Sequence, residues 1–476
     1  MEFNTNLKDI EVNNVEEKHH VREFDPVAVS RLTRAIDRHI IPVIFVIYML
    51  CYLDRVNIGF ARLYHLEKDL NLSLSEYAWT LSIFFAGYVL FEVPSNLIIK
   101  KATPSRWIAI ILFTWGIITV CLAATTNFAG LMAGRFFLGV AEAGLFPGLV
   151  FYLSFWYTRK EQAFRLGMLH SASCVAGIIA GPLSYGIGFL DGKGGLEGWQ
   201  WIFIIEGLAP TVMGIITWWV LPNTPSIVNW LSNEDKNLIV SRLEADHTDS
   251  RATKFYKSQF IEALTDYKIY FYMLMYFGFL CPVYSLAQLL PTVLSGMGFN
   301  TRDTMLLTIP PYAIAAVSNI VVAKSSDYHK ERCFHLMVPL TLSALSFLSL
   351  ILVKDLTSQY VANLFAVVGN ASATPILLAW LNNNMVGVTK SGTASAMVIC
   401  FANLGGLVAG QLFSKSEAPY FVRSNIICMC LVLMTLILSI ILRFLLIREN
   451  KKLLANPPRR EDREDNLDLT GFQYTL

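Results

Sequence analysis

Twelve apolar stretches, each long enough to cross a bilayer, constrain this chain more than any other feature of its sequence. A membrane-spanning helix needs about 20 mostly apolar residues to cross the roughly 30 Å hydrocarbon layer. The stretches that qualify are 40–60, 79–99, 107–124, 129–152, 164–189, 201–221, 269–294, 305–325, 336–353, 360–381, 393–413 and 425–447. Because 54% of the 476 residues are hydrophobic and only 16% are charged, most of the apolar surface must face lipid. We predict an all-α membrane protein with twelve transmembrane helices.

The longest polar interruption, residues 222–268, divides these stretches into six and six. We predict an N-terminal six-helix half at 39–221 and a C-terminal six-helix half at 269–447, joined by a cytosolic linker. An enzymatic domain in the linker is the alternative, but fewer than about 50 residues is near the lower limit for independent folding. Residues 1–38 lack the apolar run of a signal peptide and are expected to form a disordered cytosolic tail. Residues 448–476 form a second cytosolic tail.

Lysine and arginine in the short loops indicate the orientation of the chain. The loops expected in the cytosol carry Lys100, Lys101, Arg106, Arg159, Lys160, Arg165, Lys324, Lys330, Arg332 and Lys390. The loops on the opposite side carry acids that nearly balance their bases. Both termini are therefore expected in the cytosol, with the plasma membrane as the expected location and an internal membrane as the alternative.

Charge and cysteine content argue against other classes of protein. A net charge of +2, spread along the chain, does not indicate a nucleic-acid partner. The cysteines show no metal-ligand spacing with histidine, and no nucleophile elbow or His/Asp cluster suggests an enzyme. We expect no metal and no cofactor, and we expect the chain to work as a monomer.

Asp54 and Arg55 lie inside the first apolar stretch, where ionisable side chains are costly and indicate function by default. At about 1.5 Å per residue, Asp54 lies roughly 22 Å beyond His39. The alternative is that the helix ends here and the pair reaches the headgroups. The planar guanidinium of Arg55 offers paired donors that match a carboxylate. Asp54 either neutralises this guanidinium or takes up a proton. Asn57 and Tyr52 are positioned to add polar or stacking contacts, or to serve only in packing.

Glu142 is the second intramembrane acid, two turns after Arg135 and just before the helix-loosening Gly144. It either pairs with a functional cation or forms a structural ion pair with Arg135. Glu206, in the sixth stretch, raises the same question. Glu92 is expected to be structural. The amides 382–384 and Asn403 are expected to hydrogen-bond across helices or to substrate, and Asn403 is the best placed of them.

Several motifs occur along the two halves. They are Tyr52-Leu-Asp-Arg-Val-Asn-Ile-Gly59, Phe91-Glu-Val-Pro-Ser-Asn96, Pro104-Ser-Arg-Trp107, Arg135-Phe-Phe-Leu-Gly139, Glu142-Ala-Gly144, Phe146-Pro-Gly148, Leu290-Pro-Thr292, Ile309-Pro-Pro-Tyr312 and Trp380 with Asn383-Asn384. With these motifs the chain resembles the anion:cation symporter branch of the major facilitator superfamily, and most closely its fungal allantoate, pantothenate and nicotinate permeases. Ser391 departs from the pattern, since many fungal members have arginine there.

The resemblance implies roles for individual residues. Asp54 and Glu142 would handle protons, and Arg55 and Asn403 would bind the carboxylate of the substrate. Among the remaining candidates, Arg135, Glu92 and Arg106 are expected to act in structure or gating.

The predicted function is proton-coupled import of a small organic anion, with the two halves rocking around a central site. Nicotinate or a similar vitamin acid is the favoured substrate, because one buried arginine suits a single carboxylate. Allantoate, other ureides and pantothenate are the alternatives. A facilitative channel is the rival from another class.

Overall fold

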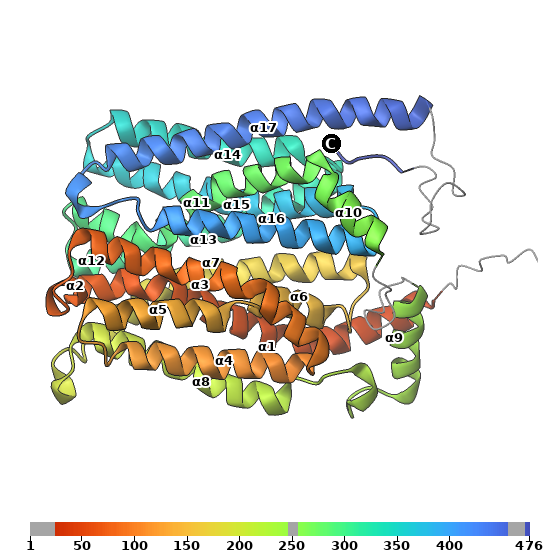
Figure 1. The fold of residues 1–476 in the computed structure, drawn as a ribbon, viewed down its shortest axis with the longest axis horizontal. Coiled ribbons are helices and arrows are strands. Elements are labelled where there is room, and N and C mark those ends of the chain that lie inside the picture. The colour runs from red at the N-terminus through yellow and green to blue at the C-terminus, as the bar shows by residue number, and fades with distance from the viewer. Residues whose placement is uncertain (1–23, 246–255, 456–471) are drawn as a thin grey trace, which may run out of the picture.

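The protein is a bundle of long helices in the computed structural model, which describes residues 24–245, 256–455 and 472–476. Twelve helical spans among these residues are long and apolar enough to cross a membrane, and the predicted fold class is confirmed. Figure 1 shows these spans lying along the long axis, with the red to yellow-green spans on one side and the later green-to-blue spans on the other.

The N-terminal half contains α1 (Pro26–Ala61), α3 (Leu74–Lys101), α4 (Pro104–Leu122), α5 (Phe128–Glu142), α6 (Leu145–Leu153), α7 (Arg159–Gly188) and α8 (Gly198–Val220). The C-terminal half contains α11 (Tyr267–Gly296), α12 (Thr301–Leu306), α13 (Ile309–His329), α14 (Cys333–Leu352), α15 (Leu356–Asn384), α16 (Val388–Ala409) and α17 (Val422–Ala455). Between the halves lie η3 (Pro225–Ile227), α9 (Asn233–Ala245) and α10 (Lys257–Thr265). Short connecting helices are η1 (Arg62–Tyr64), α2 (Leu66–Asp69), η2 (Lys193–Gly195) and η4 (Lys415–Glu417).

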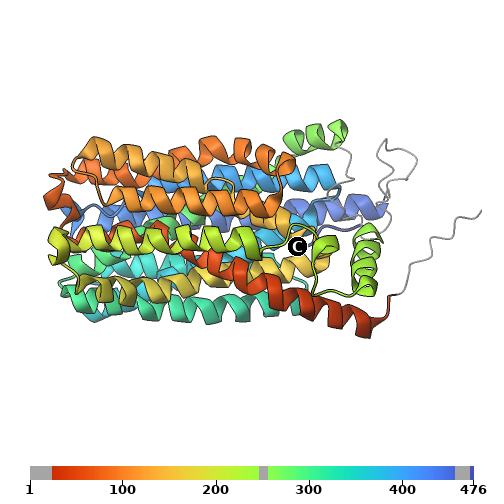
Figure 2. The same ribbon diagram turned by 90° about the horizontal axis from the view of Figure 1, so that it is seen from below.

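Helix α1 begins at Pro26, so the expectation of disorder through residue 38 is wrong for its last part; residues 1–23 lie outside the described residues. Asp25 caps the helix by accepting hydrogen bonds from two main-chain N–H groups, and Pro26 has the backbone angle that a first helical turn needs. Polar residues in this extension have partners elsewhere, since Arg31 pairs with Asp235 of α9 at 3.0 Å. Figure 2 shows α1 extending beyond the bundle beside α9.

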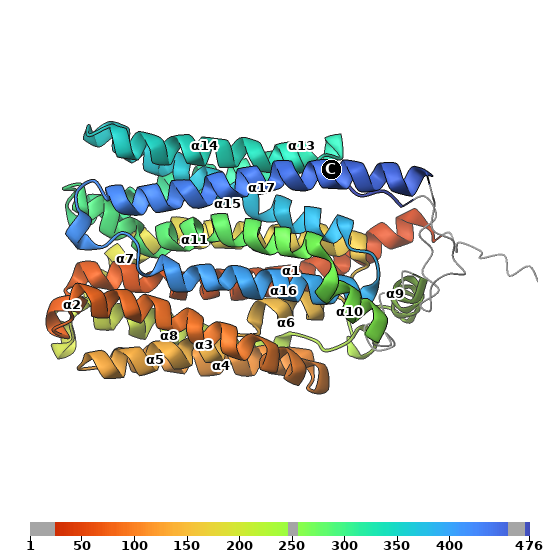
Figure 3. The same cartoon turned by 45° about the horizontal axis from the view of Figure 1, so that its top comes forward.

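We call the end of the bundle that holds the start of α1, α9 and α10 the tail end, and the opposite end the far end (Figure 1). The two halves meet where α1 packs on α11, α3 on α16, and α7 on α13. Figure 3 shows α16 lying against α3. A side chain at Gly406 of α16 would overlap the ring of Phe85, so glycine permits this close approach.

The fourth and eighth spans are each broken into two helices. In the fourth, Gly144 has φ of +140°, a conformation that residues with a side chain rarely adopt, and α5 therefore ends at Glu142. The break in the eighth lies between α12 and α13, and this span runs from 301 to 329 instead of the predicted 305–325. The helix of the eleventh span, α16, begins at Val388, five residues before the predicted start, and ends at Ala409.

Candidate functional site

An arginine and a glutamate form an ion pair in the middle of the bundle. Arg55 of α1 binds Oε1 of Glu142, the last residue of α5, with both its Nε and its Nη2 at 2.5 Å. The side chain of Arg55 is 12% exposed and that of Glu142 is fully buried. The Cys51 thiol donates to the same oxygen at 3.0 Å. Charges at membrane depth are normally paired in this way, so the ion pair explains how Arg55 and Glu142 are both tolerated inside the bundle.

Aromatic rings surround the guanidinium of Arg55. Its Cζ lies 5.1 Å from the ring centre of Tyr88 and 5.8 Å from that of Phe84, both on α3. Tyr284 of α11 lies close enough to interact with Arg55 from the C-terminal half. Arg55 therefore sits at the interface between the halves, with flat π faces on the N-terminal side and a phenol on the other.

Asp54 does not neutralise Arg55, which corrects the expected pairing of these two residues. Consecutive residues on a helix point to different faces, and Asp54 faces the interior of the N-terminal half. Its carboxylate accepts hydrogen bonds from Trp115 Nε1, from Thr119 Oγ1 at 3.4 Å and from Asn57 Nδ2 at 3.0 Å. Because α1 continues to Ala61 and Asp54 is only 1% exposed, the alternative that the pair reaches the headgroups is also wrong.

Arg135 does not form the structural ion pair with Glu142 that was the alternative for these two residues. They are two turns apart on α5, about 10 Å along the axis, and Glu142 bonds to Arg55 instead. Arg135 is 3% exposed, its Nε has no hydrogen-bond partner in the described residues, and it lies near both Asp54 and Glu142. Arg135 is thus a buried cation between the two acids.

A chain of polar contacts crosses the interface at Asn403. Its Nδ2 donates to Glu92 of α3 at 3.3 Å, and its Oδ1 accepts from the Tyr284 hydroxyl at 2.7 Å. The Cys400 thiol also donates to Glu92, at 3.2 Å. Asn403 therefore lies close to Arg55, with Tyr284 contacting both residues. Glu92, expected to be structural, joins α3 to α16.

The other candidates lie apart from Arg55. Asn57 sits in the Asp54 cluster, away from the interface at which it was expected to contact substrate. Tyr52 faces Tyr312 of α13. Arg106 lies at the tail end of α4, with its Cζ 5.6 Å from the ring centre of Trp218.

Sequence reasoning missed Tyr88, Tyr284 and Phe84 around Arg55, and Trp115 and Thr119 around Asp54. Aromatic residues are frequent in membrane helices, so only the positions of neighbouring helices single these out. One sequence signal was present, because Tyr88 precedes Glu92 by one helical turn and shares its face.

Charged residues at the far end join the two halves. Glu67 of α2 pairs with Arg62 and, at 2.5 Å, with Lys415 of the C-terminal half, while Arg62 Nη1 donates to Thr292 at 3.1 Å. Burial disfavours the charged form of Glu67, but the Arg62 and Lys415 side chains outweigh burial and hold the pKa of this carboxyl below its usual value. We call Arg62, Glu67, Thr292 and Lys415 the far-end latch.

At the tail end, the linker helices bond to different halves. Arg242 of α9 pairs with Glu161 of α7 at 2.6 Å, within the N-terminal side. Lys390 of α16 pairs with Glu262 of α10 at 2.7 Å and with Asp266 at 2.8 Å, within the C-terminal side. Each half therefore carries one linker helix with it if the halves move apart.

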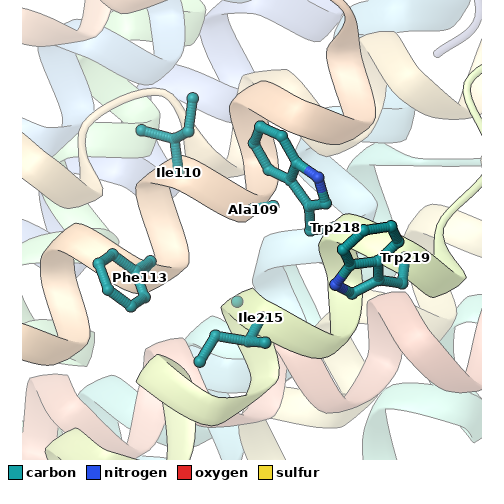
Figure 4. Close-up of a pocket in the computed structure, with 7 residues that line it drawn as sticks. Ala109, Ile110, Phe113, Ile215, Trp218 and Trp219 are labelled. Atoms are coloured by element: carbon teal, nitrogen blue, oxygen red, sulfur yellow. The ribbon is translucent and has the colours of Figure 1, made fainter.

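A surface pocket lies elsewhere, between α4 and α8 (Figure 4). It is lined by Ala109, Ile110, Phe113, Gly214, Ile215, Trp218 and Trp219. The tryptophans and Ile110 are largely exposed on the apolar outside of the bundle. This pocket contains none of the buried charges and is a groove in the surface that lipid would cover.

Comparison with known proteins matches residues 44–410 to the Major Facilitator Superfamily. The MFS transporter prlL from a fungal species is 36% identical, covering 80% of this chain and 79% of its own length. The putative metabolite transport protein NicT of Pseudomonas putida is 34% identical, covering 78% and 85%. The structure of XylE, an MFS proton:xylose symporter, matches with a TM-score of 0.65 at 15% identity, covering 86% of this chain and 95% of that one.

Two six-helix halves around buried charges define a multi-pass membrane protein. The chain belongs to the Major Facilitator Superfamily, and it is a transporter of small metabolites rather than an enzyme.

Proposed function

We propose that this transporter imports a small organic anion together with protons, as a member of the anion:cation symporter branch of its superfamily. The observation that carries the proposal is the ion pair between Arg55 and Glu142 at the interface of the halves. Asn403 and Tyr284 extend from the opposite half toward the same region.

Arg55 is suited to bind the carboxylate of the substrate. Its guanidinium is permanently charged and offers paired donors, while Glu142 uses only one of its oxygens as an acceptor in the described residues. A substrate carboxylate can replace Glu142 as the partner of Arg55 without leaving the cation unpaired.

Proton coupling follows from what happens to Glu142 after that exchange. A carboxylate that has lost its cation in a buried, apolar setting is stable only in its protonated form. Substrate binding and proton binding therefore support each other: the proton on Glu142 frees Arg55, and the substrate occupies Arg55. Asp54, near Arg135, is the second proton-coupling acid of the proposal.

The proposed transport direction depends on the orientation of the bundle. We place the tail end, with both termini, in the cytosol and the protein in the plasma membrane, on the distribution of lysine and arginine in the loops. The far-end latch then closes the outside, and substrate leaves toward the cytosol when the halves part at the tail end.

Nicotinate, or a similar flat monocarboxylate, is the favoured substrate. One arginine with a neighbouring acid matches a single negative charge, whereas a second charge would lack a partner in this apolar site. The rings of Tyr88 and Phe84 beside Arg55 offer faces for a flat ring to stack on.

The test is uptake of labelled nicotinate by yeast cells that lack their own transporter and express this chain. We expect saturable, concentrative uptake that increases as the medium is made acidic. Competition by excess allantoate or pantothenate that is stronger than by unlabelled nicotinate would reassign the substrate. A non-saturable downhill leak would instead indicate a channel and overturn the proposed coupling.

A further inference from the structure

A third acid, Glu206 of α8, is buried in the N-terminal half, and no donor among the described residues lies within normal hydrogen-bond distance of it. It is 5% exposed, and neither carboxyl oxygen has a partner among the described residues. Asn57 of α1 and Ser184 of α7 are the polar side chains next to it, 1% and 0% exposed. The Oδ1 of Asn57 and the hydroxyl of Ser184 also lack partners in this part of the structure. These three neighbouring residues thus leave four buried polar atoms without a hydrogen-bond partner among the described residues.

One proton on Glu206 satisfies all four atoms. An ionised Glu206 can accept from the Ser184 hydroxyl and from the second N–H of Asn57, but it offers no donor to Asn57 Oδ1. A protonated Glu206 donates its O–H to Asn57 Oδ1, while Ser184 donates to the other carboxyl oxygen. Buried polar groups in folded proteins are almost always paired, so the protonated form fits this environment.

The opposite orientation of the Asn57 amide does not remove the need for a proton. Its nitrogen donates to Asp54 Oδ1 at 3.0 Å in the structure. Exchanging the nitrogen and oxygen would place two acceptor oxygens at that distance, which is unfavourable unless Asp54 itself is protonated. Asp54 accepts from Trp115 and Thr119 through Oδ2 alone, so Asn57 is the donor to its Oδ1 in the described residues.

The groups around Glu206 contain no cation to balance its charge among the described residues that interact with it. Helix α1 presents Asp54, an acid, and Asn57; α7 presents Ser184. From η1, the Tyr64 hydroxyl donates to the main-chain oxygen of Ser184 rather than to Glu206. From α4, Thr119 is directed at Asp54. The charged residue that Glu206 faces is therefore another acid, Asp54, which unlike Glu206 has three hydrogen-bond donors within bonding distance.

We propose that Glu206 is a proton-binding site of this transporter and is protonated in the conformation described. The neutral acid holds Asn57, and Asn57 in turn holds the Asp54 carboxylate in place, so Glu206 is a positioning residue for Asp54. This role rests on the proposed proton-coupled function, but the protonation itself can be measured without any substrate.

Infrared difference spectroscopy of the purified full-length protein tests the proton directly. Wild type minus Glu206→Gln should show the C=O band of a protonated carboxylic acid, shifted when the protein is transferred to D₂O. Wild type minus Glu142→Gln should lack it, because Glu142 is paired with Arg55. Absence of the band in the first difference spectrum would overturn the proposal, whatever the outcome of transport assays.

The positioning role is tested by the pH dependence of nicotinate uptake. Glu206→Gln keeps a donor for Asn57 and should retain uptake at neutral pH, while the loss of uptake at alkaline pH becomes weaker than in wild type. Glu206→Ala releases Asn57 and should lose uptake by about tenfold or more. Equal activity of the two variants would contradict the positioning role. If wild type transports no nicotinate but the infrared band is present, the substrate assignment fails and the proton site stands.

Discussion

The two halves of the bundle carry different kinds of buried polar residue. In the N-terminal half, the buried charges deep within the spans are Asp54, Glu92, Arg135, Glu142 and Glu206, with Arg55 beside them, while Arg62 and Arg165 are buried at span ends. In the C-terminal half, the buried charges among the described residues are Asp266, Lys268 and Lys390, all at the tail end. The deep positions there hold amides instead: Gln288, Asn319, Asn363, Asn370 and Asn403.

This difference assigns a different task to each half. The acids that take up and release protons lie in the N-terminal half, where Arg55 and Arg135 are their cationic partners. An amide does not titrate, so the C-terminal half contributes hydrogen bonds of constant strength to substrate. Substitutions in the N-terminal half should therefore change how transport depends on pH, and those in the C-terminal half should change substrate affinity alone.

Replacing Arg55 by lysine is expected to have the largest effect. The charge is kept, but an ammonium lacks the paired donors that hold Glu142 and the substrate carboxylate. We expect uptake of nicotinate to fall by about a hundredfold, corresponding to ~3 kcal/mol. Arg423→Lys, at an exposed position of α17, is the control and should transport normally. Near-normal uptake by Arg55→Lys at equal surface expression would show that Arg55 is structural.

Replacing Asn403 by alanine tests the C-terminal side of the comparison. The variant loses the amide that bonds to Tyr284 and Glu92, and we expect KM for nicotinate to rise by about tenfold, or ~1.4 kcal/mol. The shape of the pH profile should stay that of wild type. Asn383→Ala, on the exposed side of α15, is the matched control. A shifted pH profile would mean that Asn403 takes part in coupling through Glu92.

The far-end latch should give the smallest effect. Glu67→Gln removes the acid between Arg62 and Lys415, and we expect the melting temperature in detergent at neutral pH to fall by about 2 °C. Because the pKa of Glu67 lies below its usual value, the carboxylate stabilises the folded state above the ordinary carboxyl pKa of about 4 and loses this effect as the pH falls through the lowered value. The difference between wild type and variant should therefore disappear in acid. An equal difference at every pH would exclude an electrostatic role.

The twelve spans could be predicted because a membrane helix must be apolar over its whole length, which a single sequence displays directly. The start of α1 could not, because Arg31 is polar and its partner Asp235 lies far away in the chain. Polar residues with such partners look the same in sequence as a solvated tail.

The candidate site was predictable in its residues and less so in its pairing. Asp54, Arg55 and Glu142 are conspicuous because charges are rare at membrane depth. Because Asp54 and Arg55 are adjacent in the sequence, an ion pair between them was expected. On the helix they point to different faces, and Arg55 pairs with Glu142 instead. Which residue lies across from Arg55 depends on how α1, α3 and α11 pack, and Tyr284 has no feature in the sequence that reveals it.

Proton-driven accumulation in proteoliposomes tests the central claim, that Glu142 and Asp54 couple proton and anion movement. Wild type with an acidic exterior should accumulate labelled nicotinate above the external concentration, and this accumulation should collapse when a protonophore is added. Glu142→Gln and Asp54→Asn should fail to accumulate it, yet still exchange labelled for unlabelled nicotinate across the membrane, because a neutral amide cannot cycle a proton. Full accumulation by both variants would contradict the account.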